Sequence, residues 1–240
     1  MTNQTALITG ASSGIGRAIA LAFAHAGIDL ILVSRSLEKL QAVRHEVTAL
    51  GVKAQVYAVD LSLIEQVQPQ ITKIVGEAGK LDILVNNAGM GYTGLIADTP
   101  LAHWQQVLDL NLTSVFQCMQ GVLPLMREQK QGTIVNIASI AAKQSFSGWG
   151  AYSVSKAGLV ALSQTLAIEE PDLRVITICP GAVNTELWDS ETVKVDLDRA
   201  AMLTPEAVAQ TVLYAVTLPP TTVITELTLM SNAGVLWKKR

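Results

Sequence analysis

The chain has 240 residues, of which 50% are hydrophobic and 15% charged, so it is no disordered protein and can bury a sizeable core. Its 17 Lys and Arg residues stand against 20 Asp and Glu residues, a formal net charge of −3, which excludes the broad basic surface of a nucleic-acid-binding protein. Cys118 and Cys179 lie far apart without a CxxC spacing, which favours two buried thiols in a reducing cytosol over a disulfide framework.

Seven short runs rich in β-branched residues predict strands. They cover residues 6–9, 30–33, 54–59, 83–85, 133–137, 175–179 and 223–229. Six segments between them have mostly helical apolar spacing and predict helices. They cover residues 15–25, 37–50, 63–77, 101–128, 151–169 and 205–217.

Strands that are almost wholly apolar and alternate with helices predict an α/β fold with a parallel sheet covered on both faces. A single doubly wound domain over residues 1–240 is expected, because no repeat, low-complexity stretch or linker marks a boundary. The least regular segment, 183–203, carries charges, a tryptophan and no clear period. A substrate flap beside a pocket would produce this pattern, and so would a disordered insert.

No segment predicts a membrane span. The richest apolar stretch, residues 18–33, is interrupted by His25 and Asp29, and no window approaches the roughly 18 apolar residues that a spanning helix needs. Residues 1–4 lack the positive region of a signal peptide, so a cytoplasmic protein is expected. Residues 236–240 end in three positive charges and are expected to be a solvated tail, with contact to an anionic surface as the alternative.

A glycine-rich loop joins the first predicted strand to the first predicted helix. It reads Thr9-Gly10-Ala11-Ser12-Ser13-Gly14-Ile15-Gly16. Glycines let the backbone approach an anion closely, and the free N–H groups at a helix start attract phosphate. The spacing is Gly-x3-Gly-x-Gly and not G-x-G-x-x-G, so the nucleotide cradle is inferred from the position of the loop, and a bare turn is the alternative.

Ser34 and Arg35 follow the second predicted strand, where the ribose next to an adenine would lie. No carboxylate stands there to accept from the 2′-hydroxyl group, whereas an arginine attracts a 2′-phosphate. The sequence therefore favours NADP(H) as cofactor and leaves NAD(H) possible. The alternative role of Arg35 is to begin a solvated helix.

Two further strand ends carry candidate cofactor contacts. Asp60 and Leu61 follow the third strand, and Asn87, Ala88 and Gly89 follow the fourth. A carboxylate at this edge can accept from the adenine amino group, while alanine and glycine let a ribose lie against the backbone. Taken singly, each would also suit an ordinary helix cap or turn.

Tyr152 and Lys156 are four residues apart in a predicted helix, and Ser139 ends the preceding strand. Residues at this spacing share a helix face, so the phenol and the ammonium can converge. The positive charge is expected to lower the tyrosine pKa from about 10 toward working pH. One ammonium is insufficient for a shift of about three units, roughly 4 kcal/mol, so help from a cationic nicotinamide or hydrogen bonds is implied. A surface Tyr-x3-Lys pair is the alternative.

Together these motifs resemble the short-chain dehydrogenase/reductase family, in order from residue 5 to about residue 185. The residues that match are Thr9, Gly10, Gly14, Gly16, Asp60, Asn86, Asn87, Ala88, Gly89, Asn111, Ser139, Tyr152, Lys156, Pro180 and Gly181. The resemblance implies a Rossmann-type sheet of seven strands. It also implies an intact catalytic tetrad, formed by Asn111, Ser139, Tyr152 and Lys156.

The resemblance assigns a role to each member of the tetrad. Tyr152 is the general acid or base, Lys156 lowers its pKa and holds the nicotinamide ribose, Ser139 polarises the substrate oxygen, and Asn111 anchors a water in the proton relay. By the same similarity, the backbone at Val183 and the hydroxyl of Thr185 hold the carboxamide.

The activity inferred is hydride transfer between a nicotinamide and a carbonyl or secondary alcohol carbon, with Tyr152 moving the proton. An NAD-dependent alcohol dehydrogenase and a non-catalytic dinucleotide-binding sensor or scaffold are the alternatives. No metal is expected, because the three histidines are isolated. The resemblance implies a homodimer or homotetramer that associates through the two long helices, 101–128 and 151–169.

Candidate pocket walls suit a small apolar substrate, although core packing alone would explain each of them. They are Met90, Phe146, Trp149, Leu187 and Trp188. Three features depart from the family pattern. Ser13 stands where many NADP-using relatives carry a basic residue, residues 227–234 lack the usual Gly-Gly, and the 183–203 segment, where substrate choice largely lies, is individual.

Overall fold

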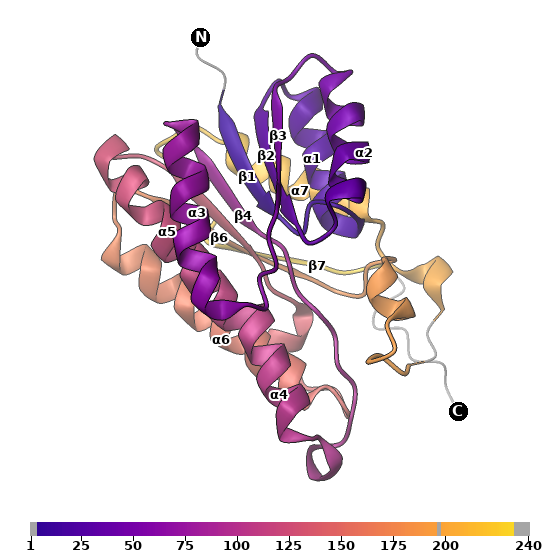
Figure 1. Ribbon diagram of the computed structural model, residues 1–240. Coiled ribbons are helices and arrows are strands. Elements are labelled where there is room, and N and C mark those ends of the chain that lie inside the picture. The colour runs from indigo at the N-terminus through magenta and orange to yellow at the C-terminus, as the bar shows by residue number, and fades with distance from the viewer. Residues whose placement is uncertain (1–3, 196–197, 233–240) are drawn as a thin grey trace.

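A computed structural model describes residues 4–195 and 198–232, and its centre is a seven-stranded parallel sheet (Figure 1). The strands are β1 (Thr5–Thr9), β2 (Asp29–Ser34), β3 (Ala54–Ala58), β4 (Ile83–Asn86), β5 (Thr133–Ile137), β6 (Arg174–Pro180) and β7 (Glu226–Leu229). They lie in the order β3-β2-β1-β4-β5-β6-β7, and every neighbouring pair is parallel. The predicted α/β class and the seven strands are confirmed.

The last strand begins three residues later than predicted. Pairing with β6 starts only at Thr225, whose carbonyl accepts from the N–H of Thr177 at 2.9 Å. Val223 therefore lies ahead of the paired segment and is 43% exposed. Val223 has the β-branched side chain typical of strands, but no strand is paired with it.

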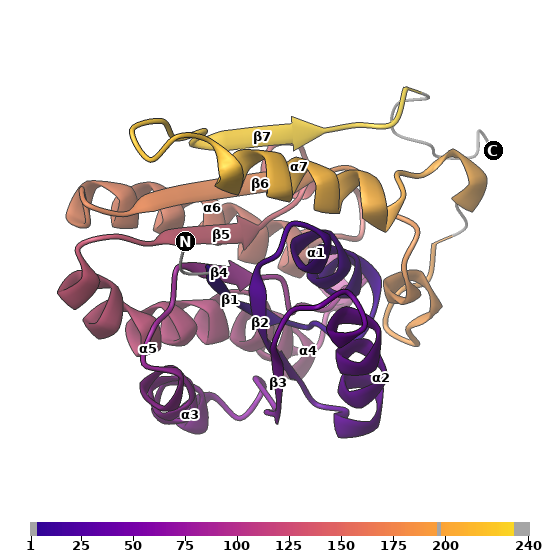
Figure 2. The same ribbon diagram turned by 90° about the horizontal axis from the view of Figure 1, so that it is seen from above.

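Helices cover both faces of the sheet, as Figure 2 shows from above. One face carries α1 (Gly14–His25), α2 (Leu37–Thr48) and α7 (Pro205–Thr217). The other carries α3 (Ile64–Ala78), α5 (Ser114–Gln129) and α6 (Gly150–Glu169), and α4 (Leu101–Leu108) packs against α6. Successive side chains of a strand point to opposite faces, so Ala6 and Ile8 join the first apolar layer while Leu7 joins the second.

Local sequence signals set where several helices begin. Thr204 caps α7, because its Oγ1 accepts from the N–H of Ala207 at 3.2 Å. Pro205 then occupies the first turn, where a missing N–H costs nothing. Ser36 caps α2 in the same way, through the N–H of Lys39 at 3.3 Å.

The helix predicted over 101–128 is present, but it contains a π-helical turn that was not predicted. This turn, Asp109–Thr113, separates α4 from α5. This turn holds Asn111, whose side chain is fully buried and hydrogen-bonded to the backbone of Met90. Apolar spacing could not reveal this wider turn, because Asn111 in the turn bonds to Met90, which lies 21 residues earlier in the sequence.

The flap, defined as residues 183–203, contains two short 3₁₀ helices, Glu186–Asp189 and Arg199–Ala201. Its two ends are joined by a β-bridge between Val183 and Leu203. Arg199 donates to the carbonyl of Thr185 at 2.7 Å, and Thr192 Oγ1 donates to the carbonyl of Gly91 at 2.7 Å. The bond of Thr192 attaches the flap to the loop that follows β4, whereas the bond of Arg199 joins two parts of the flap.

Cys118 and Cys179 are both free and buried. Across residues 4–195 and 198–232, no helix has the length and hydropathy needed to cross a membrane. The predicted basic tail, 236–240, lies outside the described residues.

Gly121 brings α5 close to α3. A Cβ atom at Gly121 would lie 2.7 Å from Ile71 Cγ2 and 2.9 Å from Ile71 Cβ. We expect Gly121→Ala to lower the free energy of unfolding by about 1–3 kcal/mol, because the helices must move apart. Urea unfolding of the variant and the wild type measures this.

Gly76→Ala is the matched control. Gly76 lies in α3, and its added Cβ would meet nothing within 4 Å. Here the better helix propensity of alanine should raise the free energy of unfolding by about 0.5–1 kcal/mol. Equal effects of the two substitutions would contradict the close packing of α3 and α5.

Candidate active site

The glycine-rich loop forms a tight cradle between β1 and α1. Gly10 and Gly14 have positive φ angles of 65° and 50°, which residues with a Cβ atom rarely adopt. Gly16 is required by space, because an added Cβ would lie 2.2 Å from the carbonyl oxygen of Gly10. The backbone at the start of α1 therefore remains open to an anion, as the sequence predicts.

Thr9 and Asn87 hold this cradle against the end of β4. Thr9 Oγ1 accepts from the N–H groups of Asn87 and Ala88 at 3.0 and 3.1 Å. Asn87 Nδ2 donates to the carbonyls of Thr9 at 3.0 Å and Gly10 at 3.3 Å. Two neighbouring strand ends are thereby fixed in one position, and the structural role of Thr9 was not anticipated from its place before the glycines.

A groove runs from the cradle to the ends of β2 and β3. It is lined by residues that include Ser12, Ser34, Arg35, Asp60 and Leu61. The hydroxyls of Ser12 and Ser34 are hydrogen-bonded at 2.7 Å, which ties the cradle to β2. The groove thus joins three strand ends that the sequence assigned to one cofactor.

Asp60 is an ionised acceptor at the far end of this groove. Partial burial raises its pKa, but hydrogen bonds from the backbone and side chain of Ser62 and the charge of Arg35 lower it on balance. The two Ser62 donors reach Asp60 Oδ1 at 3.0 and 2.7 Å. The other carboxylate oxygen can accept from a ligand.

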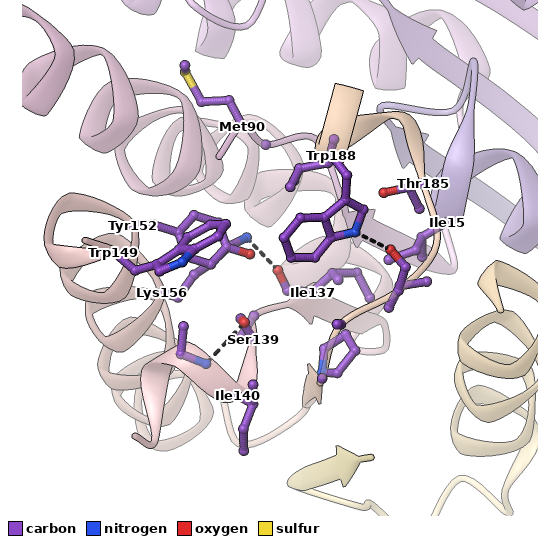
Figure 3. Close-up of a pocket in the computed structure, with 18 of the residues that line it drawn as sticks. Ile15, Met90, Ile137, Ser139, Ile140, Trp149, Tyr152, Lys156, Thr185 and Trp188 are labelled. Atoms are coloured by element: carbon purple, nitrogen blue, oxygen red, sulfur yellow. Dashed lines mark hydrogen bonds between the residues drawn. The ribbon is translucent and has the colours of Figure 1, made fainter. Parts of the chain in front are cut away.

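Ser139, Tyr152 and Lys156 converge on one pocket at the other end of the groove (Figure 3). Ser139 follows β5, while Tyr152 and Lys156 lie one turn apart on α6. Lys156 is 5% exposed, and its Nζ donates to the carbonyl of Ile137 at 2.8 Å. The same Nζ lies 5.8 Å from the centroid of the Tyr152 ring.

The expected lowering of the Tyr152 pKa by Lys156 is wrong for the protein by itself. Burial raises the pKa of Tyr152, and a hydrogen bond with Ser139 only partly opposes this. Burial also lowers the pKa of Lys156 to about 8. The Lys156 ammonium is directed at the Ile137 carbonyl. Desolvation of the phenol therefore has a larger effect on the pKa of Tyr152 than the charge of the ammonium. An acidic phenol thus needs a further positive charge in the pocket.

Asn111 lies behind the pocket and not on its wall. Its Oδ1 accepts from the N–H of Met90 at 2.8 Å, and its Nδ2 donates to the carbonyl of Met90 at 2.9 Å and to Ser155 Oγ at 3.1 Å. Asn111 thereby joins the loop after β4 to α6. Ser155 was not anticipated, although its position three residues after Tyr152 on one helix is a usable signal.

A series of buried hydrogen bonds between side chains positions α6 against the sheet, and it was not predicted from the sequence. Asn86 Nδ2 donates to Asn136 Oδ1 at 2.9 Å, and Asn136 Nδ2 donates to Ser163 Oγ at 2.8 Å. These amides stand in strands that otherwise look uniformly apolar. Polar residues within such strands are the signal that could have found this series of bonds.

The structure brings nearly all predicted site residues together. All of them line the groove or the pocket except Gly16, which lies beneath the cradle, and Asn111. The five predicted walls also line the pocket, and they are Met90, Phe146, Trp149, Leu187 and Trp188. Lining residues that were not predicted include Val59, Ala138, Ile140, Glu186, Ser190 and Met202.

The arrangement fits a dinucleotide. The cradle presents backbone to an anion, and the groove reaches Arg35 and Asp60 on one side of it. On the other side the groove and the pocket share lining residues, so a ligand can extend continuously from one to the other. The shared residues are Ile15, Asn87, Gly89, Met90, Thr185 and Leu187.

Comparisons with known proteins agree with this site. The family model described as short chain dehydrogenase matches residues 4–196. A 3-oxoacyl-[acyl-carrier-protein] reductase of Synechocystis is 34% identical over 242 residues, which cover 98% of each chain. The chain therefore belongs to the short-chain dehydrogenase/reductase family of oxidoreductases.

Solved structures show the same fold. An alcohol dehydrogenase of Thermococcus sibiricus, complexed with 5-hydroxy-NADP, superposes with a TM-score of 0.89 at 30% identity, covering 96% of this chain and 97% of that one. An actinorhodin polyketide ketoreductase with NADPH superposes with a TM-score of 0.86 at 30% identity, covering 97% of each chain. The resemblance stated from the motifs is thus confirmed.

The buried ammonium of Lys156 predicts a specific pH dependence of stability. Its pKa is about 8 in the folded protein against 10.5 in an exposed lysine, so the unfolded chain binds more protons between these values. Relative to Lys156→Met, the free energy of unfolding of the wild type should therefore rise between pH 8 and 10.5, by at most about 3 kcal/mol.

Urea unfolding of both proteins at pH 7, 8, 9 and 10, without cofactor, measures this difference. Groups shared by the two proteins cancel in the comparison. A difference that stays constant over this range would contradict a buried, charged Lys156.

Proposed function

We propose that the protein is an NADP(H)-dependent oxidoreductase that transfers a hydride between the nicotinamide and a carbonyl or secondary alcohol carbon of a small apolar substrate. One observation carries this proposal: Ser139, Tyr152 and Lys156 line a pocket that is continuous with the glycine cradle. A proton-transfer group therefore lies where the end of a bound dinucleotide would meet a substrate.

The groups of the chain provide positioning and proton transfer. When bound, NADP(H) would supply the hydride to a carbonyl carbon, or accept it from a secondary alcohol carbon. The phenol of Tyr152 would give the substrate oxygen its proton during reduction and would take it back during oxidation.

The remaining tetrad members act around the phenol. The Ser139 hydroxyl, which is hydrogen-bonded to Tyr152, holds the substrate oxygen. Lys156 and Asn111 connect α6 to the Ile137 carbonyl and to the Met90 backbone, so the phenol stays in place. Pro180, Gly181, Val183 and Thr185 form the wall where a carboxamide would be held.

Arg35 supports the choice of NADP(H) over NAD(H). It is exposed at the end of the groove, and its charge acts on Asp60 across that end. Two of the similar structures contain NADPH or an NADP derivative. An NAD-dependent alcohol dehydrogenase is the second candidate, because Ser13 adds no positive charge to the cradle.

The names of the relatives support a carbonyl or alcohol substrate in general terms. They include a 3-oxoacyl-[acyl-carrier-protein] reductase, an alcohol dehydrogenase and a ketoreductase.

We also propose a homodimer or homotetramer that associates through α5 and α6, on which Phe116 is 43% and Ile168 82% exposed. The cytoplasmic location stays a prediction from the sequence.

Consumption of NADPH and NADH with a panel of ketones, diketones, quinones and 3-oxoacyl thioesters tests the proposal. Turnover of at least one carbonyl compound, faster with NADPH, is expected. Tight binding of the cofactor without any turnover, in either direction, would favour a dinucleotide-binding sensor instead.

Arg35→Asp should raise the KM for NADPH at least about tenfold and leave that for NADH within about threefold, because the substitution replaces an attraction to the 2′-phosphate by a repulsion. Steady-state kinetics with both cofactors measure this. Arg44→Asp is the matched control, since Arg44 is exposed on α2 and outside the groove lining. Equal changes for the two cofactors would remove the argument for Arg35.

Tyr152→Phe should lower kcat at least about a thousandfold, because it removes the group that donates or accepts the proton. The dissociation constant for NADPH should stay within about threefold, since the ring and its contact with Trp149 remain. Nucleotide fluorescence titration and single-turnover kinetics measure the two quantities. A variant that retains most of its turnover would refute the assignment of Tyr152.

A further inference from the structure

The pocket beside Tyr152 is polar at one end and apolar elsewhere. Its polar side chains are those of Asn87, Ser139, Tyr152, Lys156 and Thr185. Lys156 is the one charged residue among the residues that line it, and its ammonium is already bonded to the Ile137 carbonyl. A substrate group that extends away from the reacting carbon therefore meets an uncharged surface.

Three aromatic rings lead from the catalytic end toward the flap. The centroids of Tyr152 and Trp149 are 5.2 Å apart and those of Trp149 and Trp188 are 5.8 Å apart, both edge-to-face with planes at 70°. Figure 3 shows Trp149 next to Tyr152, with Trp188 on the neighbouring wall of the pocket. Trp149 is 4% exposed at the start of α6, whereas Trp188 belongs to the flap and is only partly buried.

Trp188 is held in a defined orientation. Its indole Nε1 donates to the carbonyl of Val183 at 2.7 Å, and this bond is drawn in Figure 3. Val183 is the first residue of the flap, three residues after the end of β6, and is 6% exposed, so the indole is anchored to the buried base of the flap. A ring fixed in advance loses little conformational freedom when a ligand packs on it.

We infer that the substrate is an uncharged ketone or secondary alcohol whose side chain carries an aromatic ring, and that Trp188 is the residue that selects it. This inference rests on the proposed function. Aromatic rings prefer edge-to-face or offset contacts with one another, and such pairs contribute beyond the area they bury. A saturated ring of the same size fills the same space without this contribution.

The charges around the pocket support an uncharged substrate. Glu186 lines the adjoining groove, and Glu191 and Lys194 lie further along the exposed flap. Arg199 and Asp189 are paired at 2.6 Å, so these two charges compensate each other. An anionic substrate would lose its hydration in an apolar pocket whose one charged lining residue, Lys156, is already bonded to the Ile137 carbonyl.

Two matched ketones test the aromatic preference. In 4-phenylbutan-2-one and 4-cyclohexylbutan-2-one, two methylene groups separate the ring from the carbonyl, so the two carbonyls have similar intrinsic reactivity. For the wild type with saturating NADPH, we expect kcat/KM to be about fivefold higher for the phenyl compound. With 4-oxopentanoate, kcat/KM should be at least about tenfold lower than with its methyl ester.

Variants locate the preference at Trp188. Trp188→Phe keeps a ring and should keep a preference of about threefold, whereas Trp188→Leu should reduce the ratio to about one. Trp104→Leu is the control, since it makes the same change on α4, outside the pocket lining, and should leave the ratio at about fivefold.

The outcomes separate the two proposals. Turnover of both ketones with equal kcat/KM, or a preference that survives in Trp188→Leu, would overturn the inference about Trp188 while the proposed oxidoreductase stands. Faster turnover of the carboxylate than of its ester would overturn the uncharged substrate. Turnover of no ketone or alcohol with either cofactor would overturn both.

Discussion

The hydrogen bond between the buried Lys156 ammonium and the Ile137 carbonyl joins α6 to the end of β5. It places Tyr152, one turn earlier on α6, beside Ser139, which follows β5 two residues after Ile137. Lys156 is 5% exposed, and a buried ammonium is costly unless it is bonded, so the Ile137 carbonyl offsets part of this cost. The lowered pKa of Lys156 expresses the same cost.

Around this contact, the parallel sheet brings every other functional group to one edge. Thr9 and Asn87 fasten the glycine cradle to the end of β4, and Asn111 fastens the loop after β4 to α6. These bonds of side chains to the backbone and to Ser155 are buried or partly buried, and they fix geometry because an unpaired partner would be poorly hydrated. Cradle and pocket are therefore held as one unit, although β1 and α6 are far apart in the chain.

The flap is held by several kinds of contact. They are the ion pair of Arg199 with Asp189, the β-bridge between Val183 and Leu203, and the indole bond of Trp188 to Val183. Relatives named for different substrates share this fold. The flap contributes Leu187 and Trp188 to the walls of the pocket.

The sequence by itself determined the α/β class, the seven strands and the residues of the cradle, and it placed Ser139, Tyr152 and Lys156 together, because apolar periodicity, glycine spacing and the Tyr-x3-Lys pair are local patterns. Only the tertiary structure decided the π-helical turn at Asn111, the late start of β7 and the raised pKa of Tyr152. Each of these depends on a partner that is distant in sequence: the Met90 backbone, the neighbouring strand β6, and the surroundings that bury the phenol. A local sequence pattern does not show which distant residues will pack against a given side chain and exclude water from it.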